Sequence, residues 1–148
     1  MKAAIFLRIA SVLTLVHAVL HTVGGVFGSI PPGPASVAAT AMKANDFLFM
    51  GQTRTFWEFY RGMGLGVSIF LVAEGIVFWL LGSLVKTDGV RLRPVLALFV
   101  LTYLAMSVNS YLYFFTAPVI VEIAIAACLL GAMVTAKAAV AVSQSAHA

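Results

Sequence analysis

The chain has 148 residues, of which 62% are hydrophobic and 9% are charged, and its formal net charge is +4. Its mean hydropathy of +1.07 is typical of an integral membrane protein. No soluble domain fits beside the apolar stretches, no segment resembles a nucleic-acid-binding module, and the chain is too short for a transporter made of inverted repeats. We therefore expect one all-α polytopic membrane domain over residues 1–148, with the lipid bilayer as its main partner and no nucleic acid.

Four apolar stretches, at residues 4–28, 55–84, 94–115 and 118–142, are long enough to cross a bilayer, which takes roughly 20 residues. The alternating pattern of a membrane β-barrel is absent. Because the second and third connections are short, neighbouring helices should be antiparallel. We expect the first stretch to be retained rather than cleaved as a signal peptide, and the tail after Ala141 to fray.

The positive charges predict the orientation of these helices. Lys and Arg are enriched in cytoplasmic loops. With both termini in the cytoplasm, six of them lie at the inner face: Lys2, Arg8, Lys86, Arg91, Arg93 and Lys137. The sequence thus predicts an antiparallel four-transmembrane-helix bundle with both termini cytoplasmic, in a multi-pass protein of the cell membrane, specifically the bacterial inner membrane.

His17 and His21 share one face of the first apolar stretch. Ionisable side chains are costly inside a bilayer, so they mark candidate functional positions. Their i, i+4 spacing would let both rings meet one metal ion, with Glu122 or Glu58 as a third ligand from a neighbouring helix. The alternative is a pair of helix-packing histidines. Haem is disfavoured, because neighbours one turn apart cannot reach opposite faces of the ring.

The first connection, residues 29–53, is the only long one, and it opens with Pro31, Pro32, Gly33 and Pro34, which cannot continue a helix. Residues 36–50 form an amphipathic pattern that predicts an interfacial helix, with Gly51 as its stop. This segment is interpreted either as an inert interfacial helix or as a lid over the outer mouth.

Glu58 and Arg61 stand three residues apart at the start of the second stretch, a spacing that permits an ion pair. Alternatively, Arg61 binds an anionic group while Glu58 or Glu122 moves a proton. Depth along each helix places these residues, the two histidines and Asn109 in the outer half of the membrane. Aromatic residues around Trp57 predict an outer belt, on which a quinone or lipid could also stack.

Glu74 lies alone in the second stretch, nearer the inner half of the membrane. Arg8 is the only cation at a comparable depth. Glu74 is interpreted either as a buried structural contact or as a second step of a proton path from His17.

The segment from Phe56 to Gly64, FWEFYRGMG, combined with the two histidines, resembles small uncharacterised four-helix membrane proteins of bacteria. In length and helix count the chain also resembles the DoxX-like group, from which its long first connection departs. This resemblance implies a fold and transfers no catalytic residue.

The sequence predicts an outward-facing polar site that binds a small amphipathic or anionic ligand or a metal ion. Its expected residues are His17, His21, Glu58, Arg61, Asn109 and Glu122. One alternative is a membrane-embedded acid–base or quinone-linked enzyme using a histidine or glutamate. The other is a structural or partner subunit, and small-residue faces are compatible with a homo-oligomer or with another membrane protein as partner.

Overall fold

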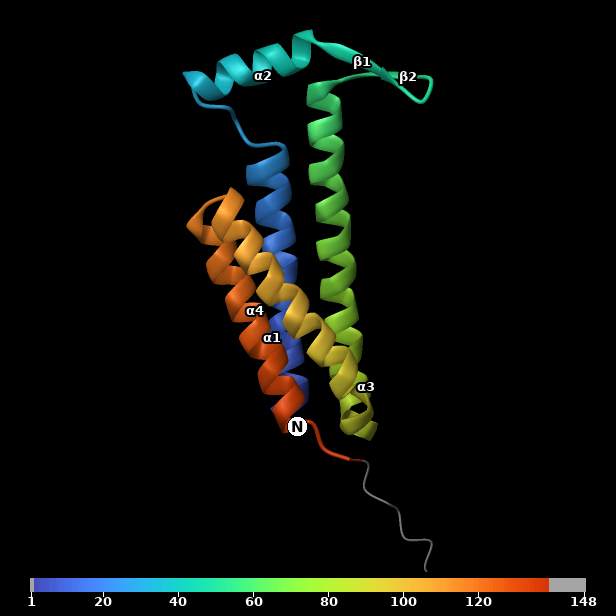
Figure 1. Ribbon diagram of the computed structural model, residues 1–148. Coiled ribbons are helices and arrows are strands. Elements are labelled where there is room, and N and C mark those ends of the chain that lie inside the picture. Colours follow the sequence, from blue (N-terminus) through green and yellow to red (C-terminus); the bar gives the residue numbers. More distant parts are fainter. Residues whose placement is uncertain (1, 139–148) are drawn as a thin grey trace, which may run out of the picture. The chain divides into compact units, whose positions relative to one another are not determined.

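The computed structural model describes residues 2–138 and is mostly helical (Figure 1). Its elements in chain order are α1 (Lys2–Leu20), the π-helical turn η1 (His21–Val26), α2 (Pro34–Ala44), β1 (Asp46–Phe49), β2 (Gln52–Thr55), α3 (Phe56–Tyr113) and α4 (Thr116–Thr135). Within these described residues, three stretches are long and apolar enough to cross a membrane: Lys2–Val26, Phe56–Tyr113 and Thr116–Thr135. The predicted fraying tail after Ala141 lies outside the described residues.

The chain divides into two compact units. The first unit combines the residues up to Thr14 with those from Glu74 onward, and the second unit comprises Leu15–Ala73. The first unit thus contains α4, the start of α1 and most of α3. The second contains the end of α1, η1, α2, the two strands and the start of α3.

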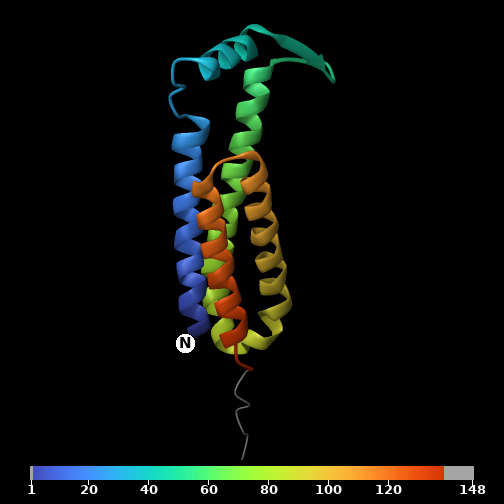
Figure 2. The same cartoon turned by 60° about the vertical axis from the view of Figure 1, so that its left-hand side comes forward.

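The first unit has a core of apolar side chains from α1, α3 and α4, most of them small or branched. Leu7, Phe78, Leu96 and Leu129 are fully buried in it. Alanines such as Ala10 occupy other buried positions and let the helix backbones approach closely. Figure 2 shows α4 beside the second half of α3, to which it is joined by a short turn.

Helix α3 contains both the second and the third predicted stretches, and the predicted connection at residues 85–93 is almost entirely helical. Only Asp88 leaves the helical conformation, with φ −148° and ψ 79°, and there the chain reverses direction (Figure 2). The Asp88 carboxylate forms an ion pair with Arg91, with 2.8 Å between Oδ2 and Nε, and an acidic residue is favourable where a new helix begins. The freed amide of Gly89 donates to the Lys137 carbonyl at 2.9 Å. One residue therefore suffices for the reversal, because its neighbours find partners for their polar groups.

In the second unit the predicted helix over 36–50 is wrong beyond residue 44. Helix α2 begins at Pro34, a residue suited to a first helical position, and ends at Ala44. Asp46–Phe49 instead pairs antiparallel with Gln52–Thr55. Met50 and Gly51 close this hairpin with φ values of 49° and 80°, the left-handed conformation that two-residue hairpin turns require. Gly51 is therefore a turn residue rather than a helix stop.

Candidate functional site

A cavity of about 340 Å³ in the second unit is formed where η1, α2 and α3 come together. It is lined by Val26, Phe27, Gly28, Ile30, Lys43, Trp57 and Arg61. The lining joins two cationic side chains to two aromatic rings and contains no carboxylate. Its size is at the lower end of the range of small-molecule sites.

Each cation of this cavity is held against an aromatic ring. The guanidinium carbon of Arg61 lies 4.5 Å from the centre of the Phe27 ring, and Lys43 Nζ lies 4.9 Å from the centre of the Trp57 ring. The negative face of an aromatic ring attracts a cation without using its hydrogen-bond donors. Neither cation has an ion-pair partner within residues 2–138. Their N–H groups are therefore free for an anionic group.

Glu58 does not pair with Arg61, so the predicted ion pair is wrong. The Glu58 carboxylate accepts hydrogen bonds from the Thr55 backbone N–H at 2.8 Å and from the Thr55 hydroxyl at 3.3 Å, and the Glu58 N–H donates to Thr55 Oγ1 at 3.1 Å. This reciprocal arrangement is the capping box, in which Thr-x-x-Glu satisfies free N–H groups at a helix start. Glu58 therefore caps the start of α3, and Arg61 has no ion-pair partner within residues 2–138.

His17 and His21 lie close together in the second unit, with ring centres 6.5 Å apart and planes nearly perpendicular. His21 Nε2 lies 3.1 Å from the Gly64 carbonyl, and because a carbonyl only accepts, this ring nitrogen is the donor. His17 Nδ1 is buried and has no hydrogen-bond partner in the described part of the chain. His21 thus joins α3 to η1, as expected of a helix-packing histidine.

Two third ligands were predicted for the metal site. Glu122 belongs to the first unit, and the Glu58 carboxylate is hydrogen-bonded to Thr55. Within residues 2–138, no group of three or more His, Cys, Asp or Glu side chains is placed to hold a metal ion. The metal site stays a prediction.

Glu122 is 2% exposed, and its Oε1 accepts a hydrogen bond from Ser110 at 2.9 Å. Its other oxygen, Oε2, is buried and has no hydrogen-bond partner in the described part of the first unit. Asn109, the neighbour of Ser110, is exposed. At this turn of α3, Ser110 is therefore the residue that reaches the carboxyl group of Glu122.

A second buried polar group in the first unit is centred on Tyr103. Its hydroxyl donates to Glu74 Oε2 at 2.7 Å and lies 3.4 Å from Thr14 Oγ1. Among the described residues Arg8 and Glu74 form no ion pair, and Arg8 Nη2 donates to Ser83 Oγ at 2.9 Å. The Glu74 carboxyl group thus accepts a hydrogen bond from Tyr103. Its partner is not Arg8, the cation that the sequence places at a comparable depth in the membrane.

The two units divide the six predicted site residues. His17, His21, Glu58 and Arg61 belong to the second unit, and Asn109 and Glu122 belong to the first. Comparison with protein families, curated proteins and solved structures finds no match. The resemblance to DoxX-like proteins therefore stays a prediction.

Phe27 and Lys43 were not predicted as site residues, and Trp57 was assigned to the aromatic belt. The spacing of Trp57 and Arg61 was a usable signal, because residues four apart share a helix face. Phe27 and Lys43 offered no such local signal. They approach α3 only because the chain returns after the proline-rich connection.

Proposed function

We propose that the chain is a multi-pass cell-membrane protein that crosses the bilayer four times, with both termini on the cytoplasmic side. In support, α3 is 58 residues long, which at about 1.5 Å per residue is nearly three bilayer cores. Its reversal at Asp88 divides it into two segments of suitable length. The excess of Lys and Arg at one set of helix ends favours this orientation.

We further propose that the protein binds a small anionic amphipathic molecule in the cavity of the second unit, on the outward-facing side. The observation that carries this proposal is the pairing of each cation with an aromatic ring, Arg61 with Phe27 and Lys43 with Trp57. A carboxylate or phosphate head would contact the free donors of both cations. The apolar part of the ligand would lie against the two rings and Ile30, which share the cavity lining.

A purely structural role explains this lining less well. Cations that only joined helices together would be expected to bind carboxylates or helix-end carbonyls. Glu58, the acidic residue one turn from Arg61, is instead occupied by the cap at Thr55.

The proposal is tested with decanoate as the anionic probe and decanol as its uncharged counterpart. Binding to the detergent-solubilised protein is measured by isothermal titration calorimetry. Decanoate should bind and decanol should bind much more weakly. Arg61→Gln should weaken decanoate binding about tenfold or more, because a hydrogen bond to a charged group contributes about 1.5–3 kcal/mol.

Arg54→Gln is the matched control. Arg54 lies in the same unit and carries the same charge, but it is exposed and donates to the carbonyl of the adjacent Thr53 at 2.8 Å. This variant should bind decanoate like the wild type. Equal affinities for decanoate and decanol, or equal losses in the Arg61 and Arg54 variants, would contradict a specific anion site.

A further inference from the structure

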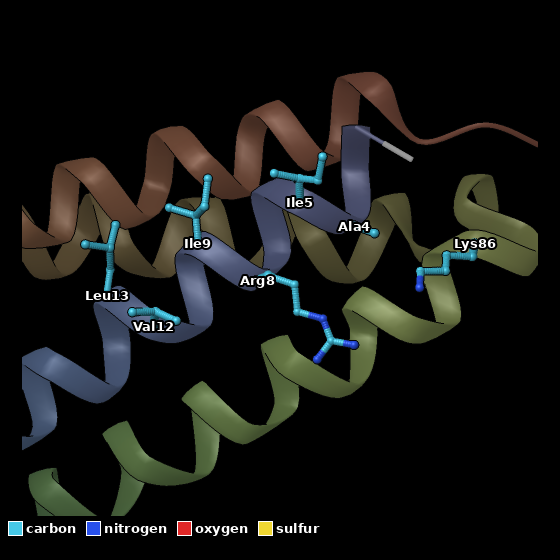
Figure 3. Close-up of a pocket in the computed structure, with 7 residues that line it drawn as sticks. All are labelled: Ala4, Ile5, Arg8, Ile9, Val12, Leu13 and Lys86. Atoms are coloured by element: carbon cyan, nitrogen blue, oxygen red, sulfur yellow. The ribbon is translucent and has the colours of Figure 1, made fainter.

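A second cavity, of about 530 Å³, lies along α1 in the first unit (Figure 3). Its lining consists of the aliphatic residues Ala4, Ile5, Ile9, Val12 and Leu13 and of two cations, Arg8 and Lys86. It is a groove with an almost wholly apolar surface, and it has no acidic residue. Its positive charge is therefore not neutralised from within.

Arg8 is held in a fixed position at this groove. Its guanidinium carbon lies 3.6 Å from the centre of the Trp79 ring, and its Nη2 donates to Ser83 Oγ at 2.9 Å. Gly82 gives the side chain room, since a Cβ there would lie 3.2 Å from Arg8 Nε. Trp79, Gly82 and Ser83 share one face of α3. The guanidinium therefore needs little further ordering to bind an anion.

One nitrogen of this fixed guanidinium is not used. Arg8 Nη1 is buried and has no hydrogen-bond partner among the described residues. A buried cationic group with an unpaired donor is destabilising, so a negative charge in the groove beside Arg8 would be favourable.

Lys86 supplies the second charge, and it follows Gly82 and Ser83 on the same face of α3. It is exposed and has no ion-pair partner within residues 2–138. In Figure 3, Arg8 extends from α1 toward α3, and Lys86 approaches the same gap from α3. Ile9, Val12 and Leu13 continue along α1 away from this pair of charges.

We propose that this groove binds an anionic phospholipid. Arg8 and Lys86 contact the phosphate group, and one acyl chain lies along Ile9, Val12 and Leu13. The inference rests on the proposed membrane insertion, which places Arg8 near the cytoplasmic surface, about 9 Å along the helix from Lys2. It concerns a different site from the cavity at Arg61, and the two can fail independently.

The aliphatic surface favours a lipid over a soluble anion. Ile5, Ile9 and Val12 are 56%, 44% and 52% exposed, and a membrane protein presents such side chains to acyl chains. Two cations beside an apolar groove fit a molecule with both a phosphate group and a hydrocarbon chain. Free phosphate would use only the charged end of the groove.

The experiment measures the thermal stability of the delipidated protein in a neutral detergent. Three additions are compared: phosphatidylglycerol, phosphatidylcholine and inorganic phosphate. Phosphatidylglycerol should raise the melting temperature, whereas phosphatidylcholine and phosphate should not. Arg8→Gln and Lys86→Gln should each weaken phosphatidylglycerol binding about fivefold, the contribution expected of one cation at an anionic membrane surface.

Three further variants make the test specific. Lys2→Gln removes the same charge outside the groove lining and should bind phosphatidylglycerol normally. Ile9→Trp keeps both cations but fills the path of the acyl chain, so this variant should lose phosphatidylglycerol binding. It tests the proposal independently of whether the Arg8→Gln variant folds. Arg61→Gln should keep phosphatidylglycerol binding, which separates this site from the proposed decanoate site.

Equal stabilisation by phosphatidylcholine would overturn the proposal, as would stabilisation by inorganic phosphate alone. Normal lipid binding by the Ile9→Trp variant would overturn the assigned acyl path. Recovery of the wild type with lipid vesicles on flotation should accompany lipid binding, and its failure would overturn the membrane insertion on which the proposal rests.

Discussion

Replacing Tyr103 with phenylalanine removes one buried hydroxyl and leaves the ring in place. Tyr103 is 2% exposed, and its hydroxyl donates to Glu74 at 2.7 Å. The substitution leaves Glu74 Oε2 without this donor in a partly buried site. We expect the free energy of unfolding to fall by about 1–2 kcal/mol. This expected loss of unfolding free energy lies between two known values. The loss caused by an unsatisfied buried polar group is larger, and the contribution of a hydrogen bond between membrane helices is smaller.

The assay is unfolding by sodium dodecyl sulfate in mixed micelles, followed by far-ultraviolet circular dichroism. A double-mutant cycle combines Tyr103→Phe with Glu74→Met, which removes the acceptor and roughly keeps its volume. The coupling energy should be about 1 kcal/mol, because each single change breaks the same bond. Tyr111→Phe is the control, since Tyr111 is 77% exposed. A coupling below about 0.3 kcal/mol, the limit of ordinary additivity, would refute the assigned bond.

Two further predictions concern packing, and the same unfolding assay checks both. Leu129→Ala should destabilise the fold by about 2 kcal/mol or more, because Leu129 is completely buried and the change leaves a cavity. The adjacent Leu130, which is 45% exposed, should tolerate the same change, and equal losses would contradict the core described above. Gly64→Ala should also destabilise the fold, by about 1–3 kcal/mol, because a Cβ there would lie 2.9 Å from Val26 Cγ2. Gly62→Ala meets nothing within 4 Å, so a loss as large as that of Gly64→Ala would argue against this close helix contact.

The positions of the long helices were largely predictable, because they depend on local hydropathy. The stretch predicted at 4–28 is helical over residues 2–26. The stretch predicted at 118–142 is helical over residues 116–135, and its extension over residues 136–138 is wrong. The segment at residues 45–55 was misjudged, since its apolar residues fit both a helical and an extended pattern. The left-handed turn at Met50 and Gly51 decides in favour of the hairpin.

The role of Glu58 was also predictable in principle. Thr55-x-x-Glu58 matches the sequence pattern of a capping box, and the pattern acts within one turn of a helix. The ion-pair interpretation considered only the partner on the C-terminal side. Spacing on a helix permits several contacts, and the free N–H groups at the helix start compete for the same carboxylate.

The contacts that bring together distant parts of the chain were beyond the sequence. Tyr103 bonds Glu74 from 29 residues away, and Arg8 bonds Ser83 from 75 residues away. Depth along a helix predicted Arg8 as the cation nearest Glu74, but it did not give the rotation of either helix about its axis. That rotation decides which side chains face each other.

The sequence by itself determined that the chain is mostly helical and where its long helices approximately lie, because hydropathy and helix propensity are summed over neighbouring residues. Only the tertiary structure decided which polar groups are partners. It assigned Glu74 to Tyr103 and Arg61 to an aromatic ring at a cavity. These assignments depend on helix rotation and on the return of the chain through its longest connection. Helix rotation and the path of the connection are both determined by contacts between segments distant in sequence. No local sequence pattern encodes those contacts.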